Sequence, residues 1–275
     1  MTFKSILVYT DRGTSAKIRL ALAGKLAENH NAYIVGLAVR QTQIYPMGFV
    51  EIIPQDVINS ISAQTEEAIV ALHGSFEAAM AACGLSANSE WRDATGDPSQ
   101  RIAVHGRYSD LIIIGQPDPD VQFGLATELA DDVLLQAGRP ILVIPDTQKE
   151  ADIGKRIMVA WNGSREAARA VADAMPLLKR AASVDVVSAN PDDIGDDPGA
   201  DIGHFLARHG VTVEVSHTLT DGISIGDELL NRTADRNTDI LVMGGYGHSR
   251  FRETVLGGAT RHILRHMTVP TLLSR

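Results

Sequence analysis

The chain contains one pattern of strands and helices twice. The stretch "SDLIIIGQ" at 109–116 closely matches "TDILVMGG" at 238–245. Each is followed by a helical pattern and then by an apolar run that begins with proline, at 140–144 and at 270–273. A self-similar pattern at this spacing predicts two copies of one folding unit.

The beginnings of the two copies also correspond, as "KSILVYTDRGT" at 4–14 and "KRIMVAWNGS" at 155–164. A polar segment separates the copies. We therefore expect a first domain at residues 1–146, a linker at 147–154 and a second domain at 155–275. A chain of 275 residues is long enough for two domains that each have a core.

Within each copy, short apolar runs alternate with stretches whose apolar residues recur at helical spacing. The apolar runs are continuous, which is typical of a parallel sheet that helices cover on both faces. Right-handed connections then favour a doubly wound, Rossmann-like sheet with the strand order 3-2-1-4-5. The expected fold class is α/β, with two such five-stranded sheets in tandem.

The last strand of each copy, at 140–144 and at 270–273, would be an apolar edge of its sheet. Exposed apolar edges promote aggregation. If the two edges pair with each other, this exposure is removed and the chain becomes an intramolecular pseudo-dimer. The sequence leaves open whether two chains associate further as a homodimer.

The expected strand order also predicts where a ligand binds. In open α/β sheets, ligands bind at the carboxyl ends of the strands between which the strand order reverses. In the second copy these ends are "WNGS" at 161–164 and "MGGYG" at 243–247. The candidate residues are Trp161, Asn162, Gly163, Ser164, Met243, Gly244, Tyr246 and Gly247. Trp161 could stack on a base or pack at the end of its strand.

The loop after the second of these strands has the composition of an anion site. Glycines let successive backbone amides approach an anion, and the first amides of the helix predicted at residues 260–267 favour phosphate. Residues 248–266 carry four arginines and three histidines against one acid, whereas residues 116–138 of the first copy carry five acids and no Lys or Arg. The expected phosphate contacts are Gly247, His248, Arg250, Gly257, Gly258, Ala259 and Thr260. Two other interpretations are a glycine-rich turn beside a solvated arginine face, and, for His248, a solvent-facing role in the loop.

The spacing Gly244-x2-Gly247-x9-Gly257 resembles the Gly-x2-Gly-x9-Gly-Ser/Thr signature of the ATP-binding universal stress proteins. The strand starts and ends quoted above extend the resemblance over the whole chain, as two tandem domains. It implies an adenine nucleotide in the second domain, foremost ATP but also ADP or AMP, with or without Mg²⁺. In the family, the motif residues contact phosphates and ribose, and the ends of strands 1 and 2 contact the nucleoside, which adds Ala189.

The second copy departs from the family's pattern at two positions. Gly258 stands where the motif has Ser or Thr, so one hydroxyl donor is missing, although Thr260 could supply another from the same helix start. Asn162 stands where the family has Asp, which the first copy keeps as Asp11. An asparagine side chain still offers both donors and an acceptor. The nucleotide preference and the affinity therefore stay open.

Bulk properties exclude several classes of function. The net charge of −9 and the pI of about 5.4 argue against binding to nucleic acid or anionic lipid. The N-terminus lacks the apolar core of a signal peptide and no apolar run is long enough to cross a bilayer, so we expect a cytoplasmic protein. His262 and His266 have zinc-compatible spacing, but no third ligand accompanies them and we expect no metal site.

Three functions fit these observations: a regulatory module that senses an adenine nucleotide and signals to a protein partner, a slow ATPase or autophosphorylating enzyme, and a scaffold or apolar-ligand protein. An ATPase needs a group that positions water and a group that holds a metal near the γ-phosphate. The loop has only Glu253 as an acid and no P-loop lysine motif, so we expect binding with little or no turnover and no catalytic residue. The apolar segment at 40–55 could cover a pocket, line an apolar site or cap the domain interface.

Overall fold

The computed structural model describes the chain except residues 1, 42–53, 117–128, 190–198, 221 and 247–257. The first half contains β1 (Ser5–Tyr9), α1 (Ala16–His30), β2 (Tyr33–Gln41), α2 (Gln55–Ala82), a short 3-10 helix (Ser86–Asn88), β3 (Ser89–Gly96), α3 (Pro98–Gly106), β4 (Leu111–Gly115), α4 (Leu129–Ala137) and β5 (Ile141–Ile144). The second half contains β6 (Arg156–Ala160), α5 (Arg165–Leu178), β7 (Ser183–Ala189), α6 (Ala200–Arg208), β8 (Val213–Thr218), α7 (Ile225–Asp235), β9 (Ile240–Gly244), α9 (Ala259–His266) and β10 (Thr271–Ser274).

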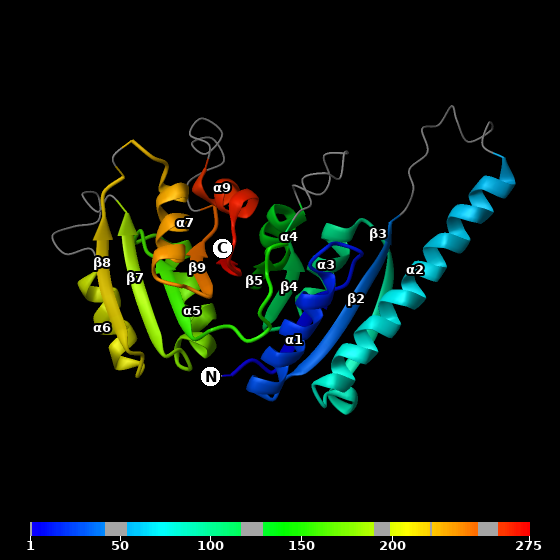
Figure 1. The fold of residues 1–275 in the computed structure, drawn as a ribbon, viewed down its shortest axis with the longest axis horizontal. Helices are drawn as coiled ribbons and strands as arrows, with labels where there is room; N and C mark the ends of the chain where they lie inside the picture. The colour runs from blue at the N-terminus through cyan, green and yellow to red at the C-terminus, as the bar shows by residue number, and fades with distance from the viewer. Residues whose placement is uncertain (1, 42–53, 117–128, 190–198, 221, 247–257) are drawn as a thin grey trace.

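The ten described strands form one continuous sheet in the order β3-β2-β1-β4-β5-β10-β9-β6-β7-β8 (Figure 1). When the strands of each half are counted in chain order, both halves have the predicted order 3-2-1-4-5 from the outer edge of the sheet to the junction. Neighbouring strands of the described sheet are parallel except β5 and β10, which are antiparallel. The predicted α/β fold is confirmed, with the two five-stranded sheets joined into one.

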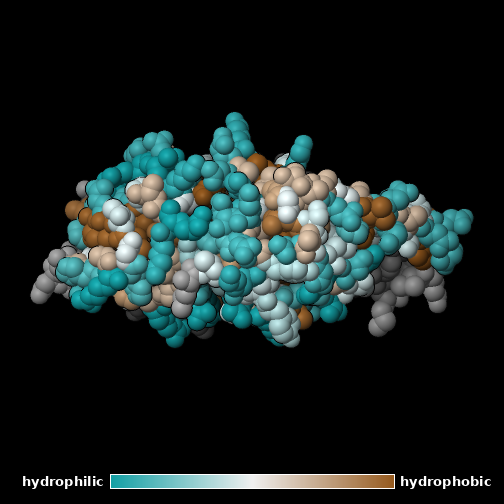
Figure 2. All heavy atoms as spheres, turned by 90° about the horizontal axis from the view of Figure 1, so that it is seen from below, coloured by the Kyte–Doolittle hydropathy of each residue, from teal (hydrophilic) through white to brown (hydrophobic). Residues whose placement is uncertain are grey.

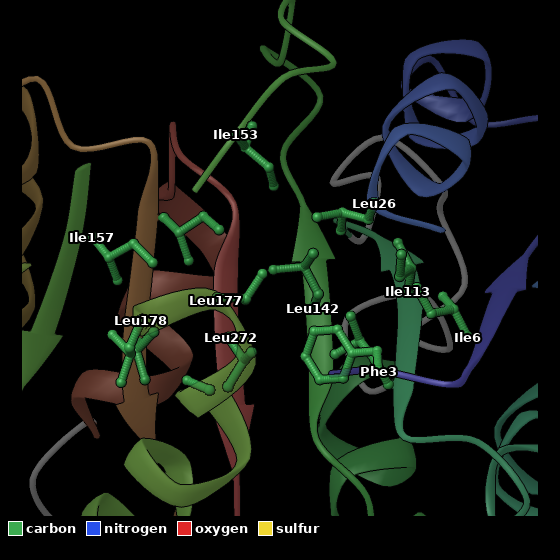
Figure 3. Close-up of a cluster of buried hydrophobic side chains, with 14 of the residues drawn as sticks. Phe3, Ile6, Leu26, Ile113, Leu142, Ile153, Ile157, Leu177, Leu178 and Leu272 are labelled. Atoms are coloured by element: carbon green, nitrogen blue, oxygen red, sulfur yellow. The ribbon is translucent and has the colours of Figure 1, made fainter. Parts of the chain in front are cut away.

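The pairing of β5 with β10 confirms that the two apolar edges cover each other. Leu142 lies opposite Leu272 across this junction, and both side chains are fully buried. One apolar cluster extends across the junction and includes Phe3 and Leu26 from the first half together with Leu177 from the second (Figure 3). The two halves therefore share a continuous core on this face of the sheet.

The helices divide between the two faces. Buried side chains of α1, α2, α5 and α6 join the cluster that crosses the junction on one face. Those of α3, α4, α7 and α9 join a second cluster on the other face. Because α4 precedes β5 and α9 precedes β10, the helices α4 and α9 both cover the central part of the sheet (Figure 1).

The repeated dipeptides "SD" and "TD" have the same structural role in both halves. The carboxylate of Asp110 accepts hydrogen bonds from the backbone amides of Lys4 (2.7 Å) and Ser5 (3.1 Å). The carboxylate of Asp239 accepts equivalent bonds from the backbone amides of residues 154–156, at 3.0 to 3.2 Å. In each half an aspartate before the fourth strand thus holds the start of the first strand, which explains the match between the two sequences.

The face drawn in Figure 2 carries several groups of apolar residues, separated by hydrophilic ones. Strongly exposed apolar side chains such as Val70, Tyr108 and Leu219 come from distant parts of the chain. None of the helices that the structure describes is long and apolar enough to span a membrane.

His30 is buried at the end of α1, with its ring 4.9 Å from that of Phe3. Burial, and next the charge of Arg180, lower the pKa of His30 to about 4. A histidine in an unfolded chain has a pKa near ~6.5, so the unfolded state binds the extra proton first as the pH falls. The contribution of His30 to stability is complete above this unfolded pKa and is lost as the pH falls toward the folded pKa.

We expect the free energy of unfolding to fall by about 3 kcal/mol through His30 alone as the pH falls from about 7 to about 4. Urea unfolding of the wild type and of His30→Gln at several pH values measures this contribution. At neutral pH we expect His30→Gln to have a lower free energy of unfolding than the wild type, because its packing changes. On acidification this variant should lose less stability than the wild type. Parallel pH profiles for the two proteins would contradict the prediction.

Candidate functional site

The structure brings together the two strand ends that were expected to form a ligand site. β6 and β9 are adjacent and parallel, and Ala160 lies opposite Met243 in their register. Residues 161–164 follow β6 and residues 245–246 follow β9, so the two segments leave the sheet side by side at its carboxyl edge. Ala189 ends β7, the next strand on the other side of β6, opposite Thr218 of β8.

A tight turn follows β6 and starts α5. The side-chain oxygen of Asn162 accepts hydrogen bonds from the backbone amide (3.1 Å) and the hydroxyl (2.7 Å) of Ser164. The Ser164 hydroxyl in turn accepts from the amide of Ala167 (3.2 Å) and caps the helix, while Gly163 takes a φ of +69°. Since its oxygen serves this turn, Asn162 would present its amide N–H₂ group to a ligand, where an aspartate would present an acceptor.

Trp161 is half-buried and packs against the apolar cluster that crosses the junction. Its backbone amide donates to the carbonyl oxygen of Val187 at 2.8 Å, which extends the pairing of β6 with β7 by one residue. These contacts favour the packing role over the stacking role for this side chain.

Gly244 ends β9 and Gly245 follows it, and close packing requires both glycines. A Cβ atom on Gly244 would lie 2.5 Å from the backbone nitrogen of Ala167 and 2.6 Å from the backbone carbon of Glu166. A Cβ atom on Gly245 would lie 2.5 Å from Cδ2 of Leu134, a residue of α4 in the first half. Gly244 and Gly245 therefore let α5 and α4 approach the end of the strand, whether or not a ligand binds.

Tyr246 turns its side chain inward. Its φ is +56°, its ring packs beside the apolar cluster under α4 and α9, and its hydroxyl is buried near Asp131 and Arg261. Burial, and next the carboxylate of Asp131, raise the pKa of the Tyr246 hydroxyl well above its usual range. A ligand at this edge of the sheet would accordingly meet the backbone of Tyr246 rather than its ring.

The start of α9 is the third described segment of the candidate site, after the turn that follows β6 and the end of β9. Gly258 is the N-cap residue, with φ −47° and ψ 138°, and Ala259 is the first residue of the helix. The side chain of Thr260 is buried, with the residue only 4% exposed. Burial favours a packing role for the Thr260 hydroxyl over replacement of the hydroxyl that Gly258 lacks.

His262 and His266 connect α9 to its surroundings within the protein. Nε2 of His262 lies 2.7 Å from Oδ1 of Asp227, and Nδ1 of His266 lies 2.9 Å from the carbonyl oxygen of His262. The hydrogen bond from Ser224 and, after it, that from His262 hold the pKa of Asp227 below its usual range despite partial desolvation. Among the described residues, no three His, Cys, Asp or Glu side chains are grouped closely enough to hold a metal ion.

Sequence reasoning missed Glu166, which is 2% exposed beside Gly244. Burial is the largest influence on the pKa of Glu166 and works to raise it. The hydrogen bond from Arg165 (2.5 Å), a backbone hydrogen bond and the charges of Arg165 and Arg275 together outweigh burial and keep the pKa below its usual range. An acid in the first turn of a helix is a common sequence signal. Nothing in the sequence distinguishes a buried acid at this place from a solvated one.

Sequence reasoning also missed Arg19, which fills the corresponding place in the first half. Arg19 is 1% exposed and donates to the carbonyl oxygen of Tyr9 (3.1 Å), the hydroxyl of Ser15 (3.3 Å) and the carboxylate of Asp11 (2.7 Å). A Cβ atom on Gly115, at the end of β4, would lie 2.0 Å from Nη1 of Arg19. The switch point of the first half is thus occupied by the protein's own guanidinium group, and Asp11 is held in an ion pair.

Four of the predicted site residues, Gly247, His248, Arg250 and Gly257, lie outside the described residues, as does most of the apolar segment at 40–55. Their roles remain predictions. The described part of the site consists of the turn after β6, the end of β9 and the start of α9.

The second half matches the sequence model of the universal stress protein family over residues 154–275. Universal stress protein Slr1230 of Synechocystis sp. is 25% identical over 177 residues, which are 60% of this chain and 58% of that protein. The chain thus spans less than two thirds of the length of this relative.

Solved structures share the fold over the whole chain. A universal stress protein from Archaeoglobus fulgidus superposes with a TM-score of 0.73 at 19% identity, covering 98% of this chain and 96% of that one. A functionally unknown protein from Pseudomonas aeruginosa, PA1789, superposes with a TM-score of 0.59 at 15% identity, covering 99% and 92% of the two chains. Residues 154–275 thus match the universal stress protein family, and the whole chain shares the fold of these solved structures.

Proposed function

We propose that the protein is a regulatory module that binds one adenine nucleotide, foremost ATP, at the carboxyl edge of its second half. The observation that carries the proposal is the difference between the two switch points. In the first half the buried guanidinium of Arg19 fills this place, and in the second half the strand ends lead to the start of α9. We further propose residues 1–146 and 155–275 as two domains, joined by a linker at 147–154.

The chemistry of the second switch point suits a phosphate group. The helix α9 begins there without an acid in its first turn, so its amides and its dipole favour an anion. Arg261 follows in the first turn, and the sequence between β9 and α9 adds further arginines. A nucleoside would then extend along the turn after β6 toward the end of β7, where Asn162 and Ala189 lie. ADP and AMP share the groups that these contacts recognise, and Mg²⁺ would accompany the phosphates rather than a cluster of described carboxylates.

The described residues favour binding over turnover. Glu166, the buried acid at this edge, is engaged by Arg165 and has a lowered pKa, so it is a poor proton acceptor. His262 is likewise engaged by Asp227. We therefore assign no catalytic residue, and we propose that the nucleotide acts as a signal read by a protein partner.

Native mass spectrometry of the purified protein tests the proposal, followed by denaturation and chromatography of the released ligand. We expect one adenine nucleotide per chain, either retained from expression or taken up from ATP with Mg²⁺. A protein that stays empty with millimolar ATP would contradict the proposal and favour the scaffold function.

The variant Gly247→Leu locates the site. A bulky side chain in the glycine motif should block the approach of backbone amides to phosphate and lower the affinity by about a hundredfold or more. Gly74→Leu is the matched control, because Gly74 is exposed on α2 and a Cβ atom added there meets no neighbouring atom within 4 Å. Full nucleotide affinity in Gly247→Leu would place the ligand elsewhere.

A further inference from the structure

The first half holds α9 of the second half at both ends. After β4, the side-chain amide of Gln116 donates to the carbonyl oxygens of Leu264 (3.0 Å) and Arg265 (3.1 Å), in the last turn of α9. In the first turn of α9, Nε of Arg261 lies 3.6 Å from Oδ2 of Asp131, a residue of α4. The helix that opens the candidate site is therefore positioned by residues that are more than a hundred positions away in the sequence.

Asp131 lies beneath the start of the candidate site. Its side chain is 11% exposed, that of Arg261 is 62% exposed, and the buried hydroxyl of Tyr246 lies close to both. Leu134, one turn further along α4, packs against the neighbouring Gly245. The acidic turn of α4 thus contacts both the end of β9 and the first turn of α9.

We propose that Asp131 is a positioning residue that restrains Arg261, and that through it the first half lowers the affinity of the second half for the phosphates of its ligand. The proposal rests on the proposed nucleotide site. A carboxylate and a phosphate compete for the same guanidinium group, since both accept its charge-assisted hydrogen bonds. A bound nucleotide would accordingly draw Arg261 from Asp131 and weaken a contact between the two halves, which couples ligand binding to their junction.

The variant Asp131→Asn tests the restraint, because asparagine keeps the shape of the side chain and removes its charge. We expect ATP to bind about three- to tenfold more tightly at low salt, since Arg261 is released and a negative charge near the anion is lost. The gain should shrink as the salt concentration rises. The variant Asp131→Glu keeps the negative charge and should bind ATP with the wild-type affinity. Asp56→Asn changes the net charge equally at an exposed position of α2 and should leave the affinity unchanged.

A double-mutant cycle with Arg261→Gln assigns the effect to the ion pair. We expect Arg261→Gln to weaken ATP binding in both backgrounds, but by a smaller factor in the wild type, where Asp131 competes for the arginine, than in Asp131→Asn, where it should cancel most of the gain. Isothermal titration calorimetry with ATP gives the four dissociation constants, and thermal unfolding confirms that the variants are folded. A purely structural role for Asp131 would lower the melting temperature without tightening binding.

The outcomes separate the two proposals. If the wild type binds ATP and Asp131→Asn binds it equally or more weakly, the restraint is wrong and the nucleotide site stands. The restraint is also wrong if the gain is the same with glutamine at position 261, because the effect then does not pass through Arg261. If neither the wild type nor Asp131→Asn binds any adenine nucleotide, both proposals are wrong. If only Asp131→Asn binds it, the restraint is supported and is stronger than expected.

Discussion

Replacing Gly244 with alanine is expected to lower the free energy of unfolding by about 2 to 4 kcal/mol and to weaken nucleotide binding with it. The added Cβ atom would lie 2.5 Å from a backbone nitrogen and 2.6 Å from a backbone carbon at the start of α5. Backbone atoms inside a capped helix cannot move aside as the end of a flexible side chain can. Either β9 or the turn after β6 must shift, and these two segments together form the candidate site.

Urea unfolding of Gly244→Ala beside Gly74→Ala measures this effect. Gly74 lies within α2 and a Cβ atom there meets no other atom within 4 Å. Alanine is a better helix former than glycine by ~1 kcal/mol, so the control variant should be equal to the wild type or more stable. A Gly244→Ala protein as stable as the wild type would mean that the end of β9 accommodates a side chain, and that its glycine is not required by packing.

Replacing Leu272 with alanine should lower the free energy of unfolding by about 3 kcal/mol, through lost burial and the cavity left at the junction. Leu272 lies opposite Leu142 in the antiparallel pairing of β10 with β5, and both are 0% exposed. Figure 3 shows that the two side chains point into the apolar cluster to which both halves contribute. Because this core is continuous, we expect both halves to unfold in one transition.

Chemical unfolding followed by circular dichroism and by tryptophan fluorescence tests this prediction, since Trp91 and Trp161 report on different halves. Leu219→Ala is the control, because this leucine is 66% exposed and its loss should change stability by less than about 0.5 kcal/mol. Two separated transitions in the wild type, or a Leu272→Ala variant as stable as the control, would show that the junction contributes little to stability.

The sequence predicted which strand ends lie side by side better than which side chains face inward there. Because the carboxyl ends of adjacent parallel strands meet at one edge of a sheet, the repeat and the strand order were enough to bring residues 161–164 and 244–246 together. The sequence did not indicate which of these residues face inward. Tyr246 packs its ring beneath α9, and Thr260 is buried, although both were expected to contact the ligand.

The sequence indicated only part of the difference between the switch points of the two halves. Charge along the chain indicated that the first copy would repel phosphate, through the acids at 116–138. The structure shows a second difference, the buried guanidinium group of Arg19, which lies at the first switch point and forms an ion pair with Asp11. In the sequence, Arg19 is a basic residue in a helical stretch, and such residues are usually solvated.

The sequence by itself determined the order of strands and helices and the pairing of the two apolar edges. The hydrophobic period and the strand connections are local properties, and each of the two copies contains them. Only the tertiary structure decided that Gly244 and Gly245 admit neighbouring helices, that Arg19 and Glu166 are buried, and that Asp131 reaches Arg261 across the junction. These features depend on distances between atoms that are far apart in the chain. The pattern of residue types along a single chain does not contain such distances.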